Sequence, residues 1–340
     1  MSRLLKLAVG AALTALVLYW SHPSQILDAA AAADWRWLGA ALALVLVDRT
    51  LMAMRWIELL VALAPGTRPP LGTVLRVFFV SSFVSNFVPS VGADLYRAYA
   101  LSRYDVHLAE STASVLMDRA LGVLSVVLVA AIALPFATVE GSRDLVVLLG
   151  AMGIVCAIAA AVVFSERAAN LVRATAERLP ITMLHRVAAA LTDAVRAYAS
   201  HHGAIARVLA LSIVVQIFRV LQAWCLGLGL GIELPLSTYF AFIPLIVFIM
   251  QVPITPNGLG TTQLAFDRFF VPQGAPRPEV FALSVLFLAL GILGSLPGGV
   301  LYAFGGQTGV RPGSDRGQTG VRPGSDRGQT PAASDAEFEK

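Results

Sequence analysis

Two polar segments, SNFVPSVGADLYR (residues 85–97) and QVPITPNGLGTTQ (residues 251–263), interrupt sequence that is otherwise apolar. Each segment begins within an apolar stretch, breaks at proline and glycine, and continues with polar residues. Non-helical backbone at membrane depth is tolerated only where protein buries it or where it lines a wet cavity. Because there is one such segment in each half of the chain, the pattern points to a transporter-like binding site near the bilayer midplane.

The composition is that of a polytopic membrane protein. Hydrophobic residues make up 57% of the 340 residues and charged residues 14%, and the mean hydropathy is +0.75; soluble proteins have about 25% charged residues. The net charge of +4 fits basic loops facing an anionic cytoplasmic leaflet and requires no nucleic-acid partner. Cys156 and Cys225 lie in apolar runs and the histidines lack metal-ligand spacing, so we predict no disulfide framework, metal or cofactor.

Hydropathy predicts an all-α bundle of transmembrane helices. Arg3 and Lys6 precede the first apolar run, and no run of small residues follows it, which favours an uncleaved first helix over a signal peptide. The two broken segments, roughly 71–97 and 238–266, are additional to the runs of spanning length, which lie near residues 4–20, 36–63, 112–136, 145–164, 205–230 and 280–304.

Charge placement predicts how the broken segments sit in the membrane. The loop between residues 166 and 207 should be cytoplasmic because it carries Arg167, Arg173, Arg178, Arg186, Arg196 and Arg207. If both broken segments are re-entrant, this loop and both termini face the cytoplasm. We therefore predict six spans plus two re-entrant broken helices in the inner membrane. Eight full spans are the alternative.

The basic loop and the C-terminal tail have different patterns. Apolar residues recur in the loop at helical spacing at Leu184, Val187, Leu191, Val195 and Tyr198. They predict either helices on the membrane surface or a helical connector packed on its own protein. The tail repeats GQTGVRPGSDR at residues 306–316 and 317–327. We predict an integral membrane domain at 1–305 and a disordered tail at 306–340.

Several charged side chains occur inside apolar runs, where each costs about 2.5–3.5 kcal/mol on insertion scales. Asp48 and Arg55 are seven residues apart and share a helix face, so internal pairing is one interpretation. Asp94 and Arg97 could pair in the same way, and Asp118 could pair with an arginine of another helix. In that interpretation the pairs are structural. In a lipid-binding site, Asp94 and Asp118 would instead orient the arginines that bind phosphate.

Two further features, a set of arginines and a glycine turn, favour a phosphate ligand. Arg97, Arg119 and Arg219 lie in or beside apolar segments, and guanidinium offers a donor fork matched to phosphate. Snorkelling to the interface is the alternative for Arg97 and Arg119. Gly258 and Gly260 permit a tight turn, with or without a ligand, after which the free amides of a restarting helix could meet an anionic headgroup.

The predicted site binds a lipid, with no catalytic or metal-ligating residue. Neutral hydrogen bonds are expected from Asn86, Gln251 and Asn257. The complete set of predicted lipid-binding residues is Asn86, Pro89, Gly92, Asp94, Arg97, Asp118, Arg119, Gln216, Arg219, Gln251, Pro256, Asn257, Gly258, Gly260 and Gln263.

Three motifs carry a resemblance: PSVGADLYR at residues 89–97, SVLMDRALG at 114–122 and PNGLG at 256–260. In this order they resemble the lysylphosphatidylglycerol synthase transmembrane-region family of flippase-like integral membrane proteins, over roughly residues 5–305. The resemblance implies a lipid-translocating module. The short tail leaves no soluble aminoacyl-transferase domain, so synthase activity is not expected. Many relatives look to have an acidic residue where this chain has Gln263, which weakens the expectation of a cationic headgroup.

The leading hypothesis is therefore a membrane protein that binds an anionic phospholipid and moves it between leaflets. A membrane enzyme or enzyme subunit acting on a lipid-linked intermediate is the first alternative, although GxSxG, HExxH and Walker motifs are absent from the sequence. The second is a non-catalytic accessory that scaffolds enzymes of lipid or cell-envelope synthesis. Formation of a covalently changed lipid would distinguish the enzyme from the transporter.

Overall fold

The computed structural model describes residues 33–63, 70–86, 90–102, 107–133, 165–177, 182–251 and 260–304, with isolated positions at 28, 31 and between 150 and 161. Within these residues all regular secondary structure is helical. They belong to one compact unit that extends to Gly306. The protein is an all-α, multi-pass membrane bundle, as predicted. The tail at 306–340 and the first apolar run, near 4–20, lie outside the described residues.

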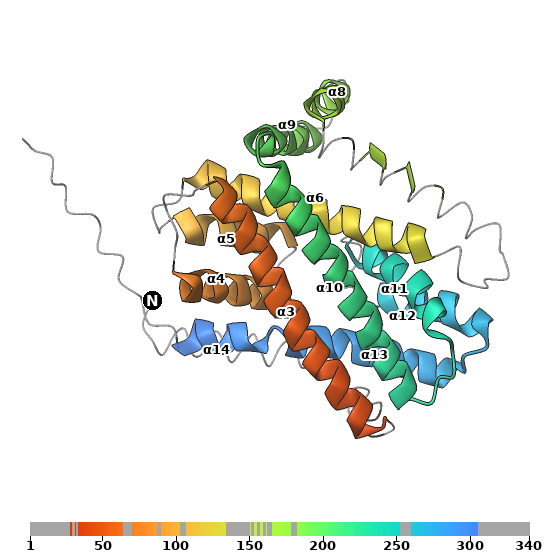
Figure 1. Cartoon of the computed structure of the whole chain (residues 1–340). Helices are drawn as coiled ribbons and strands as arrows, with labels where there is room; N and C mark the ends of the chain where they lie inside the picture. The colour runs from red at the N-terminus through yellow and green to blue at the C-terminus, as the bar shows by residue number, and fades with distance from the viewer. Residues whose placement is uncertain are drawn as a thin grey trace, which may run out of the picture. The chain divides into compact units, whose positions relative to one another are not determined.

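Two long antiparallel helices, α3 (Trp35–Leu63) and α10 (His202–Gly229), pack along each other and lie side by side in Figure 1. Asp34 N–H donates to the Gly229 carbonyl (2.8 Å) at one end, and Arg207 pairs with Glu58 toward the other. Helix α6 (Leu108–Ala133) packs on both. Within the described residues, the helices long and apolar enough to cross a membrane are Trp35–Leu63, Leu108–Ala133, His202–Gly229 and Arg277–Ala303.

These helices confirm the predicted spans near 36–63, 112–136, 205–230 and 280–304. The run near 145–164 lies outside the described residues except for isolated helical positions. The last span is interrupted, which the sequence did not lead us to expect: α13 (Arg277–Leu293) ends at a turn of Gly294 and Ser295, and α14 (Leu296–Phe304) follows. Pro297 has no backbone N–H to continue the ladder, so the break falls just before it.

The first broken segment forms a helical hairpin of α4 (Leu71–Val84) and α5 (Ser90–Ser102), which pack against each other. Val74 near the start of α4 and Leu101 near the end of α5 share a hydrophobic cluster with Leu60 near the end of α3. The open end of this hairpin therefore lies at the end of α3. Helix α14 packs along α4 (Figure 1), with Gly299 against the ring of Phe83.

The second broken segment forms another hairpin, of α11 (Leu236–Gln251) and α12 (Thr261–Phe270). Near its open end, the rings of Tyr239 and Phe270 meet with centroids 5.0 Å apart, and Tyr239 lies against Gly227 near the end of α10. The short helix η3 (Val271–Gln273) then leads to α13. The two hairpins thus open at opposite ends of α10.

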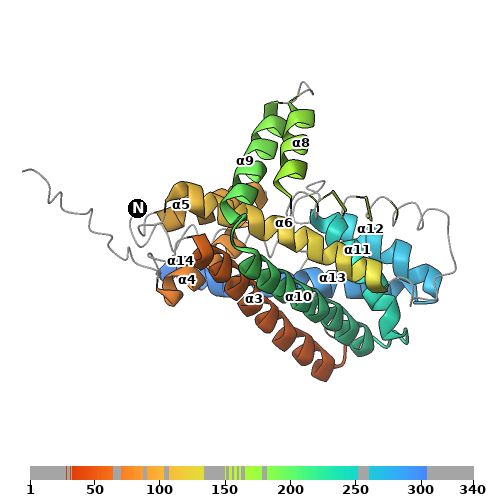
Figure 2. The same ribbon diagram turned by 45° about the horizontal axis from the view of Figure 1, so that its top comes forward.

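The basic loop contains two helices, α8 (Glu166–Ala176) and α9 (Thr182–Tyr198), which pack together and extend away from the other helices in Figure 2. The helical stripe is confirmed where it is described, since Val195 and Tyr198 are buried while Arg196 is exposed. Tyr198 donates from its hydroxyl to the Leu59 carbonyl of α3 (2.7 Å). Burial raises the pKa of this hydroxyl, which keeps it protonated as a donor.

Candidate functional site

A cavity of about 300 Å³ lies between the inner ends of the two hairpins and helices α3, α6, α10 and α13. Ser85 and Asn86 at the end of α4 line it, as do Met250 and Gln251 at the end of α11. Its other polar and charged lining residues are Asp48, Arg49, Arg55, Ser81, Ser82, Asp94, Arg97, Asp118, Arg119, Gln216, Arg219, Gln222 and Ser295. The volume is at the lower end of the range for ligand pockets, large enough for a headgroup.

Charge in this cavity is unbalanced. Among the described lining residues, five arginines (Arg49, Arg55, Arg97, Arg119 and Arg219) face three aspartates (Asp48, Asp94 and Asp118), an excess of two positive charges. Charged groups inside transmembrane segments are costly to insert and usually mark a functional pathway. An anion entering the cavity would offset the excess.

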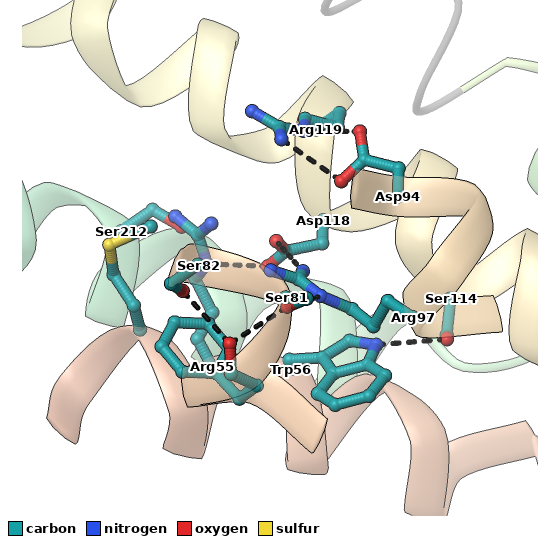
Figure 3. Close-up of polar contacts among 12 residues, drawn as sticks. Arg55, Trp56, Ser81, Ser82, Asp94, Arg97, Ser114, Asp118, Arg119 and Ser212 are labelled. Atoms are coloured by element: carbon teal, nitrogen blue, oxygen red, sulfur yellow. Dashed lines mark hydrogen bonds and ion pairs between the residues drawn. The ribbon is translucent and has the colours of Figure 1, made fainter. Parts of the chain in front are cut away.

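Asp118 on α6 joins two of the arginines (Figure 3). Its Oδ1 accepts from Arg55 Nε at 2.7 Å, and its Oδ2 lies 3.6 Å from Arg97 Nη1. Arg55 also donates from Nη1 to Ser212 Oγ on α10 (3.1 Å). All three charged side chains are at least nine-tenths buried. The predicted pairing of Asp118 with an arginine of another helix is confirmed, and the partners come from both α3 and α5.

Arg97 contacts two aromatic rings. Its guanidinium carbon lies 4.9 Å from the ring centroid of Trp56 and 5.0 Å from that of Phe78, a cation–π geometry. Its Nε donates to Ser81 Oγ (3.3 Å). The Trp56 indole is itself fixed by donating to Ser114 Oγ (3.2 Å), as Figure 3 shows. These contacts fix Arg97 in place, and the snorkelling interpretation is wrong for this residue because its side chain is buried.

Arg119 and Asp94 form a separate, bidentate pair (Figure 3). Arg119 donates from Nε to Asp94 Oδ2 (2.8 Å) and from Nη2 to Asp94 Oδ1 (2.9 Å). The Arg119 side chain is 45% exposed. The predicted pairing of Asp94 with Arg97 is wrong, because Arg97 is turned toward Asp118 and the aromatic rings.

Asp48 is paired with Arg219 of α10, with 3.3 Å between Asp48 Oδ1 and Arg219 Nε. The predicted Asp48–Arg55 pair is wrong: the two residues share a helix, but Arg55 reaches across to α6. Arg219 also donates to Met52 Sδ (3.1 Å), and its side chain remains 20% exposed. All three predicted phosphate-binding arginines line the cavity. Arg219 is neither fully buried like Arg97 nor held in a bidentate pair like Arg119.

Arg49 is positioned by the break between α13 and α14. In a continuous helix the Ser295 N–H would donate a hydrogen bond to the Gly291 carbonyl. Here it donates to the Ile292 carbonyl instead (2.9 Å), which leaves the Gly291 carbonyl without that bond. The Gly291 carbonyl accepts from Arg49 Nη2 (3.0 Å). At the same break, Ser295 Oγ accepts a hydrogen bond from Asn86 Nδ2 (2.8 Å). The break in the last span therefore helps to form the cavity wall.

Eight of the predicted lipid-binding residues line the cavity: Asn86, Asp94, Arg97, Asp118, Arg119, Gln216, Arg219 and Gln251. Gly92 and Gly260 do not, and neither does Gln263. Gly260 adopts φ +82, as the tight-turn prediction requires, and its N–H donates to Gln263 Oε1 (2.7 Å). Gln263 thus caps the start of α12. Pro89, Pro256, Asn257 and Gly258 lie outside the described residues.

The predicted set left out several lining residues, among them Asp48, Arg49, Ser81, Ser85 and Ser295. Asp48 and Arg49 could have been included from sequence, since both charged residues interrupt an apolar run. The serines gave no such signal, because a lone serine in an apolar helix usually bonds its own backbone. Ser85 does so, donating to the Ser82 carbonyl (2.7 Å).

Comparison with known proteins decides the family. The chain matches the family described as the lysylphosphatidylglycerol synthase TM region over residues 3–298. The chain belongs to this family. The match includes every described residue of the cavity, and membership supports a role associated with membrane lipid. No curated protein and no solved structure matches the chain.

Proposed function

We propose that this member of the lysylphosphatidylglycerol synthase TM region family binds the headgroup of an anionic phospholipid and moves the lipid between leaflets. The observation that carries the proposal is the excess of two positive charges in a cavity whose charged lining residues all lie within helices. An anionic phosphate is the group that such a cavity would stabilise.

The position of two cavity residues along α3, and hence their depth in the bilayer, supports this proposal. Asp48 and Arg49 lie near the middle of the 29-residue helix α3, roughly 20 Å from either end at about 1.5 Å per residue. The hydrocarbon core of a bilayer is about 30 Å thick, so these side chains lie near its midplane if α3 crosses it. A headgroup site at that depth is useful for a lipid that must pass between leaflets.

The two hairpins also support it. Their open ends lie at opposite ends of α10 and their inner ends meet at the cavity. This arrangement supports the proposal that the two hairpins are re-entrant elements that would enter from opposite membrane faces, as in transporters with broken helices around a midplane site. The residues between their helices, 87–89 and 252–259, would complete the site, including Pro89, Pro256, Asn257 and Gly258.

We assign different roles to the arginines. Arg219, Arg49 and Arg119 would contact the phosphate. Asp118 and Arg97 would hold the cavity walls in place, because both are buried and bonded to protein groups. Asn86 and Gln251 would supply neutral hydrogen bonds. The basic residues around α8, α9 and the start of α10 favour a cytoplasmic location for that end of the bundle, and an inner-membrane protein.

Substituting Arg219 tests the proposal. In proteoliposomes containing tail-labelled phosphatidylglycerol, we expect Arg219→Gln to slow the exchange of label between leaflets by about tenfold or more. A hydrogen bond to a charged group contributes about 1.5–3 kcal/mol, and about 1.4 kcal/mol corresponds to tenfold. The measurement is the rate at which the inner-leaflet label becomes accessible to a membrane-impermeant quencher.

Arg207→Gln is the matched control, because Arg207 is also an arginine of α10 with a carboxylate partner, Glu58. Its side chain is 66% exposed and does not line the cavity. Exchange should be unchanged in this variant. Equal exchange rates for wild type and Arg219→Gln, with both proteins folded, would contradict the proposal that the lipid passes through the cavity.

A further inference from the structure

The charged residues of the cavity wall differ widely in exposure. The side chains of Arg55, Arg97 and Asp118 are at most 8% exposed, whereas that of Arg119 on α6 is 45% exposed. Gln251, which lines the cavity from the end of α11, is exposed as well. Helices α5 and α11 both pack against α6. The accessible side of the cavity therefore lies at Arg119 and Gln251, where α5 and α11 border α6.

The depth of Arg119 indicates what this side of the cavity faces. Arg119 is the twelfth residue of the 26-residue helix α6, roughly 17 Å from one end and 21 Å from the other at about 1.5 Å per residue. If α6 crosses the bilayer, whose hydrocarbon core is about 30 Å thick, the opening faces acyl chains. Leu95, directly after Asp94 on α5, is 63% exposed and suits the same surroundings. An opening at this depth would let a headgroup enter the cavity while its acyl chains stay in the bilayer.

The ion pair of Asp94 and Arg119 joins α5 to α6 at this opening (Figure 3). Its two hydrogen bonds, of 2.8 and 2.9 Å, use both carboxylate oxygens of Asp94. Asp94 lies near the start of α5, whose first residue, Ser90, follows the break between α4 and α5. The pair therefore holds the start of α5 against α6, at the point where the first hairpin reaches the cavity.

Asp94 and a lipid phosphate would compete for Arg119. Carboxylate and phosphate both present two oxygens that match the guanidinium fork. Because an exposed ion pair contributes little free energy, an incoming phosphate can replace Asp94 at small cost. The buried pairs of Asp118 with Arg55 and Arg97 do not allow such an exchange, since breaking a buried pair leaves an uncompensated charge.

We propose that Asp94 and Arg119 form a latch across a lateral opening between α5 and α11, and that the lipid phosphate opens the latch by displacing Asp94 from Arg119. The displaced carboxylate would then be repelled by the phosphate, and the start of α5 would be free to move away from α6. This inference rests on the proposed function, since it assumes that an anionic lipid enters the cavity. It adds the place of entry and identifies Asp94 as a residue that restrains transport.

Substituting Asp94 tests the latch. In the proteoliposome assay with tail-labelled phosphatidylglycerol, we expect full-length Asp94→Asn to exchange label about three times faster than wild type, because an ion pair open to water is lost. This factor corresponds to about 0.7 kcal/mol at about 1.4 kcal/mol per tenfold. Loss of a residue that only stabilises the fold, or only orients Arg119, would leave exchange unchanged or slower. Exchange by folded Asp94→Asn at or below the wild-type rate would overturn the inference.

Glu58→Gln is the matched control for this variant. Glu58 is also the carboxylate of an exposed pair between helices, with Arg207, but neither residue lines the cavity. Exchange should stay at the wild-type rate. The same increase in Glu58→Gln would mean that loosening any pair between helices speeds exchange, and it would overturn the assignment of the latch to Asp94.

Arg119→Gln tests whether the phosphate takes the place of Asp94. Both this variant and Asp94→Asn break the latch, but only Asp94→Asn keeps the guanidinium that would receive the phosphate. We therefore expect Arg119→Gln to exchange label no faster than wild type. An increase equal to that of Asp94→Asn would mean that the pair is only a closure, and it would overturn the displacement step.

The double variant Asp94→Asn/Arg219→Gln separates passage through the cavity from a leak beside a loosened helix. If the effects of the two substitutions are independent and multiply, the double variant should exchange label about threefold more slowly than wild type. Exchange as fast as in Asp94→Asn alone would indicate a leak and would overturn the inference. Slow exchange by Arg219→Gln with an unchanged rate for Asp94→Asn would overturn the latch and leave the proposed function standing.

Discussion

Replacing Asp118 with Asn is expected to cause the largest loss of stability of any single change in the cavity wall. Asp118 is the shared anion of two buried arginines, Arg55 and Arg97. Without it, two guanidinium groups remain in a low-dielectric interior with no carboxylate. Removing one partner from a buried ion pair costs about 3–5 kcal/mol. The measurement is the free energy of unfolding from a denaturing-detergent titration in mixed micelles.

Asp94→Asn is the matched control for this prediction. It removes the same charge from the same cavity, but its partner Arg119 is 45% exposed, and pairs open to water contribute about 0–1 kcal/mol. The unfolding free energy should therefore change little. Equal losses in the two variants would mean that the Asp118 network does not hold α3, α5 and α6 together.

Gly298→Ala is expected to have the second largest effect, because it separates α14 from α4. A Cβ at Gly298 would overlap the carbonyl oxygen of Phe79 and would lie 3.0 Å from Phe83 Cβ. The obstacle is backbone, which cannot rotate away as a side chain could. Overpacking of this kind costs about 1–3 kcal/mol. It would also displace the C-terminal end of α4, where Ser85 and Asn86 line the cavity.

The control is Gly39→Ala on α3, where an added Cβ meets no atom within 4 Å. There the substitution should leave stability unchanged or raise it by about 0.5–1 kcal/mol, since alanine is the better helix former. Melting temperatures in the same detergent should fall for Gly298→Ala and not for Gly39→Ala. If Gly298→Ala melts with the wild type, the close approach of α14 to α4 is not part of the fold.

The span pattern and the two breaks could be predicted from sequence because both depend on local chemistry. Hydropathy alone locates α3, α6 and α10, and proline with glycine locates the interruptions between α4 and α5 and between α11 and α12. The break at Gly294 and Ser295 was missed. A glycine and a serine are ordinary within an apolar span, and this break depends on Pro297 and on the fit of α14 against α4.

The charged residues of the site could also be found from sequence, but their partners could not. The free-energy cost of placing a charged side chain in the membrane identifies Asp48, Asp118 and Arg219 as candidates whatever the fold is. Pairing is decided by which helices pack: Asp48 lies beside α10 and pairs with Arg219, while Arg55, on the same face of α3, reaches α6. Sequence spacing describes neighbours along a helix and carries no information about neighbours across the bundle.

The most direct test of the central claim is the lipid that accompanies the protein. We would purify wild type, Arg219→Gln and Arg207→Gln in mild detergent and quantify the lipids bound to each by mass spectrometry. The account predicts that one anionic phospholipid is enriched over its share of the membrane with wild type and Arg207→Gln, and that the enrichment is lost with Arg219→Gln. Equal enrichment in all three proteins, or a zwitterionic lipid enriched in place of the anionic one, would contradict it.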